Sequence, residues 1–175
     1  RQSLIAFFSL IGLTIIGYLS TMYFAHVLGP AILGSYFLFL AYYGVFDLIG
    51  DGGFGGATVK RISEGKDQNQ YFSAFIALRV ALLVISVTAL LILFPYIVDL
   101  NNSGLIPWLI LALLIGTIAS VAQNGIYGTG KAGISQISGF INTVIKIIVQ
   151  VIATFLGYAV AGLVGGFIVG MIAGL

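Results

Sequence analysis

The residues of this sequence that could do chemistry are a few charged side chains inside long apolar segments. Asp47 and Asp51 stand four residues apart in FDLIGDGGFGGATVKRIS, residues 46–63, and therefore share one face of a helix. Arg79 and Lys146 stand inside two later apolar segments. Such charges could bind an ion, hold an anionic ligand, or neutralise one another within a helix bundle.

Lys146 belongs to a polar stripe in which Asn142, Lys146 and Gln150 recur every four residues, with Ser138 before them and Thr154 after them. An ionised side chain at the bilayer centre costs about 2.5–3.5 kcal/mol, so we expect the stripe to face the bundle interior or a water-filled cavity. Interhelical hydrogen bonds average only about 0.6 kcal/mol and do not by themselves require five polar positions in line. A cavity lined by Lys, Asn and Gln suits a hydroxyl-rich substrate with an anionic headgroup.

Composition indicates that the elements carrying these residues are membrane spans. Of the 175 residues, 60% are hydrophobic and 7% are charged, whereas soluble domains average roughly 25% charged residues. So few charges could not cover a soluble surface, and we expect an integral membrane protein. The net charge of +2 is too small to indicate nucleic acid as a partner, and the absence of cysteine excludes thiolate metal sites. No catalytic residue, metal or cofactor is expected.

The sequence predicts an all-α, polytopic transmembrane bundle of about six helices, with residues 1–175 as a single transmembrane lobe. A span needs about 20 apolar residues, and the apolar runs are twice the length of barrel strands without their alternation. Both ends lie close to or inside apolar runs, which favours a fragment whose last span is truncated. The expected spans are roughly 3–27, 33–58, 71–97, 107–127, 134–156 and 160–175.

Basic residues predict the orientation of these spans. Lys60, Arg61 and Lys66 lie in the second loop and Lys131 in the fourth, whereas the first, third and fifth loops have none. Arg1 precedes the first span. Because Lys and Arg gather in cytoplasmic loops, we expect the even loops and the N-terminus in the cytoplasm, in the cell (inner) membrane.

Counting residues from the cytoplasmic ends gives the depth of each charge. With 1.5 Å per residue, Asp51 and Arg79 both lie about 12 Å deep on neighbouring antiparallel spans. We therefore expect them to be close enough to pair. Asp47 and Lys146 both lie about 18 Å deep, near the bilayer centre, by the same count. A structural salt bridge between these two is the alternative to a substrate-binding role for Lys146.

One motif is a near match to a phosphate-binding loop. GIYGTGKA, residues 125–132, resembles G-x-x-x-x-G-K-[ST], but Ala132 replaces the hydroxyl residue that would hold magnesium. Such a loop should also follow a strand, whereas this one follows a predicted span. We interpret it as a tight cytoplasmic turn.

The chain contains YFAHVLGPAILGSYFLF at residues 23–39 and, as quoted above, FDLIGDGGFGGATVKRIS at residues 46–63. These two stretches resemble the polysaccharide flippase family of the multidrug/oligosaccharidyl-lipid/polysaccharide exporter superfamily. In YFAHVLGPAILGSYFLF, residues 23–39, LGP…LGSY is similar to the turn between that family's first two helices. FDLIGDGGFGGATVKRIS is similar to the end of its second helix, where an apolar and glycine-rich stretch leads to a basic residue and a short cytoplasmic loop. The succession of spans and loops fits the family over the whole chain.

The resemblance implies one lobe of a two-lobed bundle of 12 to 14 helices that works by alternating access. The implied substrate is an isoprenyl-diphosphate-linked oligosaccharide, moved between leaflets among the membrane lipids. The family's cavity is typically cationic, which Lys146 and Arg79 fit. Asp47 and Asp51 depart from that pattern and leave room for a coupling ion, H⁺ or Na⁺.

Three other functions stay open at this stage. A drug or organic-cation antiporter of the same superfamily would be favoured by a cavity dominated by the acids. A membrane-embedded glycosyltransferase or polysaccharide polymerase should carry a large polar loop with residues for acid–base chemistry, and the longest polar loop here has neither. A purely structural membrane subunit would not need the polar stripe. The leading interpretation is therefore a transporter and not an enzyme.

Overall fold

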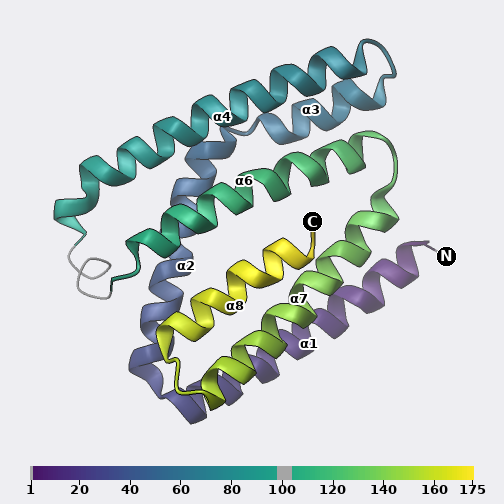
Figure 1. Ribbon diagram of the computed structural model, residues 1–175. Helices are drawn as coiled ribbons and strands as arrows, with labels where there is room; N and C mark the ends of the chain where they lie inside the picture. The colour runs from purple at the N-terminus through teal and green to yellow at the C-terminus, as the bar shows by residue number, and fades with distance from the viewer. Residues whose placement is uncertain (1, 98–103) are drawn as a thin grey trace. The chain divides into compact units, whose positions relative to one another are not determined.

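The computed structural model describes residues 2–97 and 104–175, which are almost entirely helical (Figure 1). Arg1, counted above with the cytoplasmic positive charges, lies outside the described residues. The helices follow the order of the expected spans. They are α1 (Gln2–Leu28), α2 (Pro30–Asp51), α3 (Phe54–Ser63), α4 (Gln68–Leu93), the 3₁₀ helix η1 (Phe94–Tyr96), α6 (Ile106–Gly128), α7 (Ala132–Phe155) and α8 (Val160–Ala173).

The helical segments have the length and surface of membrane spans. Among the described residues, five are long and apolar enough to cross a bilayer: 11–28, 30–51, 68–96, 106–128 and 133–155. At 14 residues, α8 is shorter than the about 20 that a span needs. Large apolar side chains such as Leu48 and Phe155 are 71% and 78% exposed, which suits a surface in contact with lipid. The all-α class is confirmed, and the chain is a multi-pass membrane protein.

The turns between helices form where the sequence predicts them. Gly29 ends α1 with a left-handed φ of 83°, a conformation that costs glycine little, and Pro30 then begins α2. The stretch that resembles a phosphate-binding loop connects two helices, because α6 ends at Gly128 and α7 begins at Ala132. It follows a helix and not a strand, so its interpretation as a turn is confirmed.

The stretch 33–58, expected as one span, contains a break. The helix α2 ends at Asp51, and α3 starts only at Phe54. Gly52 and Gly53 between them have φ values of 56° and 77°, and two consecutive left-handed residues cannot continue a right-handed helix. The apolar pattern runs through the break, so periodicity gave no sign of it. Asp51 is therefore the last residue of one helix and faces the start of the next.

The chain divides into two compact units, described separately here. One contains residues up to 38 together with 136–174, and in it α8 runs alongside α7. The other contains residues 39–135, where α3 and α4 both pack against α6 and against each other (Figure 1). The expectation of a single lobe over residues 1–175 stays a prediction.

Candidate functional site

The charged residues of the 39–135 unit form one cluster around Arg79. This guanidinium, on α4, is 1% exposed, and its Nη1 donates to Oδ1 of Asp51 at 3.1 Å. Its Nη2 lies 3.8 Å from Oδ1 of Asp47, within ion-pair range but too far for a hydrogen bond. The predicted Asp51–Arg79 pair is confirmed. Asp47, expected level with Lys146, also reaches this arginine.

The break after α2 shapes the surroundings of Asp51. A Cβ placed on Gly55, in the first turn of α3, would lie 3.4 Å from Oδ1 of Asp51 and 3.1 Å from Nδ2 of Asn124. A side chain at position 55 would touch the carboxylate and would require the Asn124 amide to shift slightly. The carboxylate thus sits beside the N-terminus of a helix, where the free N–H groups and the helix dipole stabilise negative charge. In transporters, broken helices direct half-helix N-termini at anionic groups, while unwound carbonyls and half-helix C-termini coordinate cations.

The cluster carries more negative than positive charge, and its arginine is incompletely bonded. Two carboxylates, 31% and 36% exposed as side chains, face one guanidinium. Within the described residues, the buried Nε and Nη2 of Arg79 have no hydrogen-bond partner. Ser86 on α4 donates to the carbonyl of Phe46 at 2.6 Å and holds α4 against α2 beside the acids. The arrangement can neutralise Arg79 and still leave one carboxylate for a cation.

The polar stripe lies on α7, where its backbone faces a row of glycines on α8. Gly162, Gly166, Gly170 and Gly174 recur every four residues, the same period as the stripe. A Cβ on Gly170 would lie 2.6 Å from Cβ of Lys146 and 2.8 Å from the carbonyl oxygen of Asn142. Small residues permit this close approach of membrane helices. The sequence reasoning treated most glycines as packing residues but did not match this row to the stripe, although the shared spacing was a signal.

Two side chains of the stripe, Gln150 and Ser138, are hydrogen-bonded inside the bundle. Gln150 is 3% exposed, and its Nε2 donates to Oη of Tyr36 at 3.0 Å and to the carbonyl of Leu163 at 2.7 Å. Both amide hydrogens are thereby used, and α2, α7 and α8 are held together. Ser138 donates to the carbonyl of Gly174. These bonds give Gln150 and Ser138 a structural part, whereas a role of Gln150 in lining a cavity stays a prediction.

The middle of the stripe is different, because Asn142 and Lys146 are only half-buried. The unit that contains Lys146 has no Asp or Glu in its sequence, since all five acids of the chain fall between residues 39 and 135. Lys146 therefore has no carboxylate counter-ion within its own unit. Its pairing with Asp47 stays a prediction. A lysine so placed in a span is a candidate for binding an anionic group.

Known proteins resemble this chain in sequence. A sequence profile of the family described as polysaccharide biosynthesis protein matches residues 1–175. The "probable low-salt glycan biosynthesis flippase Agl15" of Haloferax volcanii is 28% identical over 116 residues, which are 66% of this chain and 25% of that protein. The matched segment thus spans about a quarter of the length of the flippase. No solved structure is significantly similar to the chain.

The profile match covers every span, the acid–arginine cluster and the polar stripe on α7 together. The chain therefore belongs to the polysaccharide biosynthesis protein family.

Proposed function

We propose that this chain is part of a flippase that moves an isoprenyl-diphosphate-linked oligosaccharide across the cell membrane by alternating access, with its N-terminus in the cytoplasm. The observation that carries the proposal is Lys146, a half-buried cation on a spanning helix in a unit without any acid. The family match and the flippase among its relatives support a transporter over an enzyme.

In the proposed mechanism Lys146 binds the diphosphate of the substrate. A lysine ammonium acts as a point charge, and its attraction for phosphate is screened less where water is scarce. Asn142, one turn away on the same face, is half-buried as well and supplies an amide for a phosphate oxygen or a sugar hydroxyl. The glycine row on α8 fixes the α7 backbone from which both side chains project.

The cluster at Arg79 has a different part in this proposal. Its surplus carboxylate, at the break between two helices, supports binding of a coupling ion, H⁺ or Na⁺. The same surplus favours the second candidate, a drug or organic-cation antiporter. In an antiporter the acids would bind the cargo and Lys146 would be dispensable, so the two functions predict opposite results at these positions.

The experiment is glycan export in cells that depend on the full-length protein. Lys146→Gln should keep normal membrane levels of the protein and abolish export, and Lys146→Arg should restore part of it. Lys60→Gln, at an exposed lysine of α3, is the matched control and should export normally. Normal export by Lys146→Gln, with drug efflux lost in Asp47→Asn, would replace the flippase with the antiporter.

A further inference from the structure

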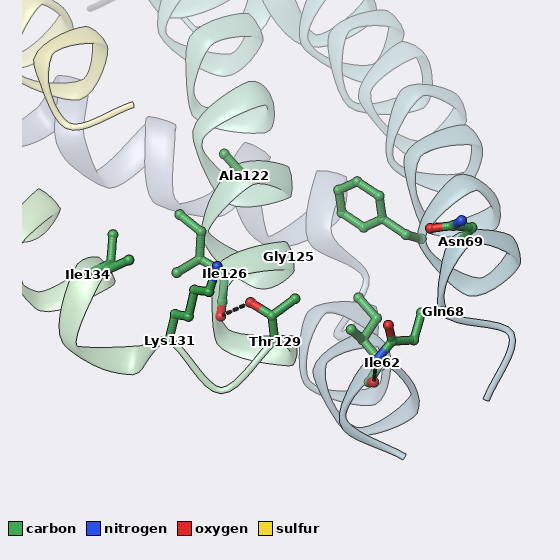
Figure 2. A pocket seen from close by; sticks show the side chains of 10 residues that line it. Ile62, Gln68, Asn69, Ala122, Gly125, Ile126, Thr129, Lys131 and Ile134 are labelled. Atoms are coloured by element: carbon green, nitrogen blue, oxygen red, sulfur yellow. Dashed lines mark hydrogen bonds between the residues drawn. The ribbon is translucent and has the colours of Figure 1, made fainter. Parts of the chain in front are cut away.

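A pocket of about 480 Å³ opens at one end of the 39–135 unit. It lies between the end of α3, the first turns of α4, the last two turns of α6, and the turn into α7 with the start of that helix (Figure 2). Lys131 and Thr129 line one side, and Gln68 and Asn69 line the other. Because α4 and α6 are both spans, a pocket at their ends lies at the boundary between membrane and water.

The floor of the pocket is apolar and is built from closely packed helices. Phe72 of α4, Ile62 of α3 and Ile126 of α6 line it. A Cβ on Gly125 would lie 3.1 Å from the Phe72 ring, and one on Gly128 would lie 2.6 Å from Cβ of Ile62. The floor is therefore set by contacts between helices.

Lys131 is the one charged residue among those that line the pocket. Gln68 uses its Nε2 to donate to the carbonyl of Ile62 at 2.8 Å, so its Oε1 can accept a hydrogen bond from a ligand. Lys131 and Asn69 supply donors. The same end of the unit also carries three further basic residues, Lys60, Arg61 and Lys66, against two acids, one of which, Glu64, is paired with Arg61. The site thus suits an anion that also has hydroxyl groups.

We propose that this pocket binds an anionic phospholipid, with its phosphate at Lys131 and Asn69 and the start of an acyl chain against Phe72 and Ile126. A polar mouth over an apolar floor at the membrane boundary matches the two halves of a phospholipid. Basic pockets between helices at such a boundary recognise anionic headgroups. The volume falls within the range of small-molecule pockets and is sufficient for a phosphoglycerol headgroup.

The test uses the full-length protein in vesicles, with a fluorophore attached at Ile134→Cys and any other cysteine replaced. Ile134 lines the pocket and is 52% exposed. Brominated phosphatidylglycerol should quench the fluorophore at least three-fold more effectively than brominated phosphatidylcholine. Lys131→Gln should remove this preference, and Lys131→Arg should keep it. Lys66→Gln is the control for a general effect of surface charge and should also keep it.

Four results would overturn the proposal. Equal quenching by both lipids would show that the pocket does not select an anionic headgroup. A preference that survives Lys131→Gln, or is lost equally in Lys66→Gln, would assign the effect to the charge of the whole surface. Displacement of phosphatidylglycerol by a smaller mole fraction of an isoprenyl diphosphate would assign the pocket to the transported lipid.

Discussion

Removing one partner of the Asp51–Arg79 pair should destabilise the protein more than removing both. Arg79 is 1% exposed, and the buried Nε and Nη2 have no other hydrogen-bond partner within the described residues. Asp51→Ala would leave this charge with Asp47 alone, at 3.8 Å. Breaking a buried ion pair costs about 3–5 kcal/mol. We expect about 3 kcal/mol for Asp51→Ala, the low end of that range, because Asp47 still compensates part of the charge.

The Arg79 variant and the double variant are needed to calculate the interaction energy between Asp51 and Arg79. Arg79→Met should cost about 2 kcal/mol, since the two carboxylates left behind are partly exposed and can be hydrated. The double variant Arg79→Met with Asp51→Ala should cost only about 1–2 kcal/mol, because it leaves no buried guanidinium without its nearest carboxylate. Asp47→Asn is the matched control and should cost about 1 kcal/mol or less, as expected for a longer, partly exposed pair.

The assay is reversible unfolding of the purified full-length protein in mixed micelles, titrated with a denaturing detergent. The free energies of unfolding of the four variants and the unchanged protein give the interaction energy directly. We expect a coupling of about 3 kcal/mol between positions 51 and 79. If the double variant loses as much stability as the two single variants together, the pair does not exist in the membrane protein.

Three further predictions follow from the α7–α8 contact and the expected topology. Gly170→Leu should destabilise the protein by about 1–3 kcal/mol through overpacking against Lys146 and Asn142. Gly139→Leu, at a position with open space, is the control and should not destabilise it. The midpoints of unfolding of the two variants test this difference. Gln150→Leu should cost about 1–3 kcal/mol because it leaves buried polar groups unpaired, and adding Tyr36→Phe should recover part of that loss; no recovery would argue against the bond. Lys66→Cys should resist labelling by impermeant thiol reagents in intact cells. Labelling would show that this loop is external and that the predicted topology is wrong.

The sequence predicted the all-α class and most spans because long apolar runs depend on local composition alone. It also predicted the Asp51–Arg79 pair, since counting residues along two adjacent antiparallel helices is enough to match their depths. The break at Gly52 and Gly53 could not be found in this way, because backbone dihedrals change there while the apolar pattern continues. Asp47 and Asp51 both reach Arg79 because they lie one turn apart on the same helix, α2, before the break.

The polar stripe shows the limit of one-helix reasoning. Its period placed Lys146 and Gln150 correctly on one face of α7, but the face of a single helix does not identify its neighbour. The glycine row on α8 and the bonds of Gln150 to Tyr36 and Leu163 depend on tertiary packing. Because Gln150 is buried and bonded, Lys146 and Asn142 are left as the half-buried part of the stripe. The proposed substrate contact is therefore limited to these two side chains.

The most direct test of the central claim is translocation of a fluorescent isoprenyl-diphosphate-linked oligosaccharide by the purified full-length protein in sealed vesicles. A membrane-impermeant enzyme or quencher outside the vesicles reports the fraction of lipid in each leaflet over time. The unchanged protein and Lys60→Gln should equilibrate the lipid between leaflets, while Lys146→Gln, equally folded, should slow this at least ten-fold. Translocation by Lys146→Gln at the rate of the unchanged protein would contradict the claim that this lysine binds the transported diphosphate.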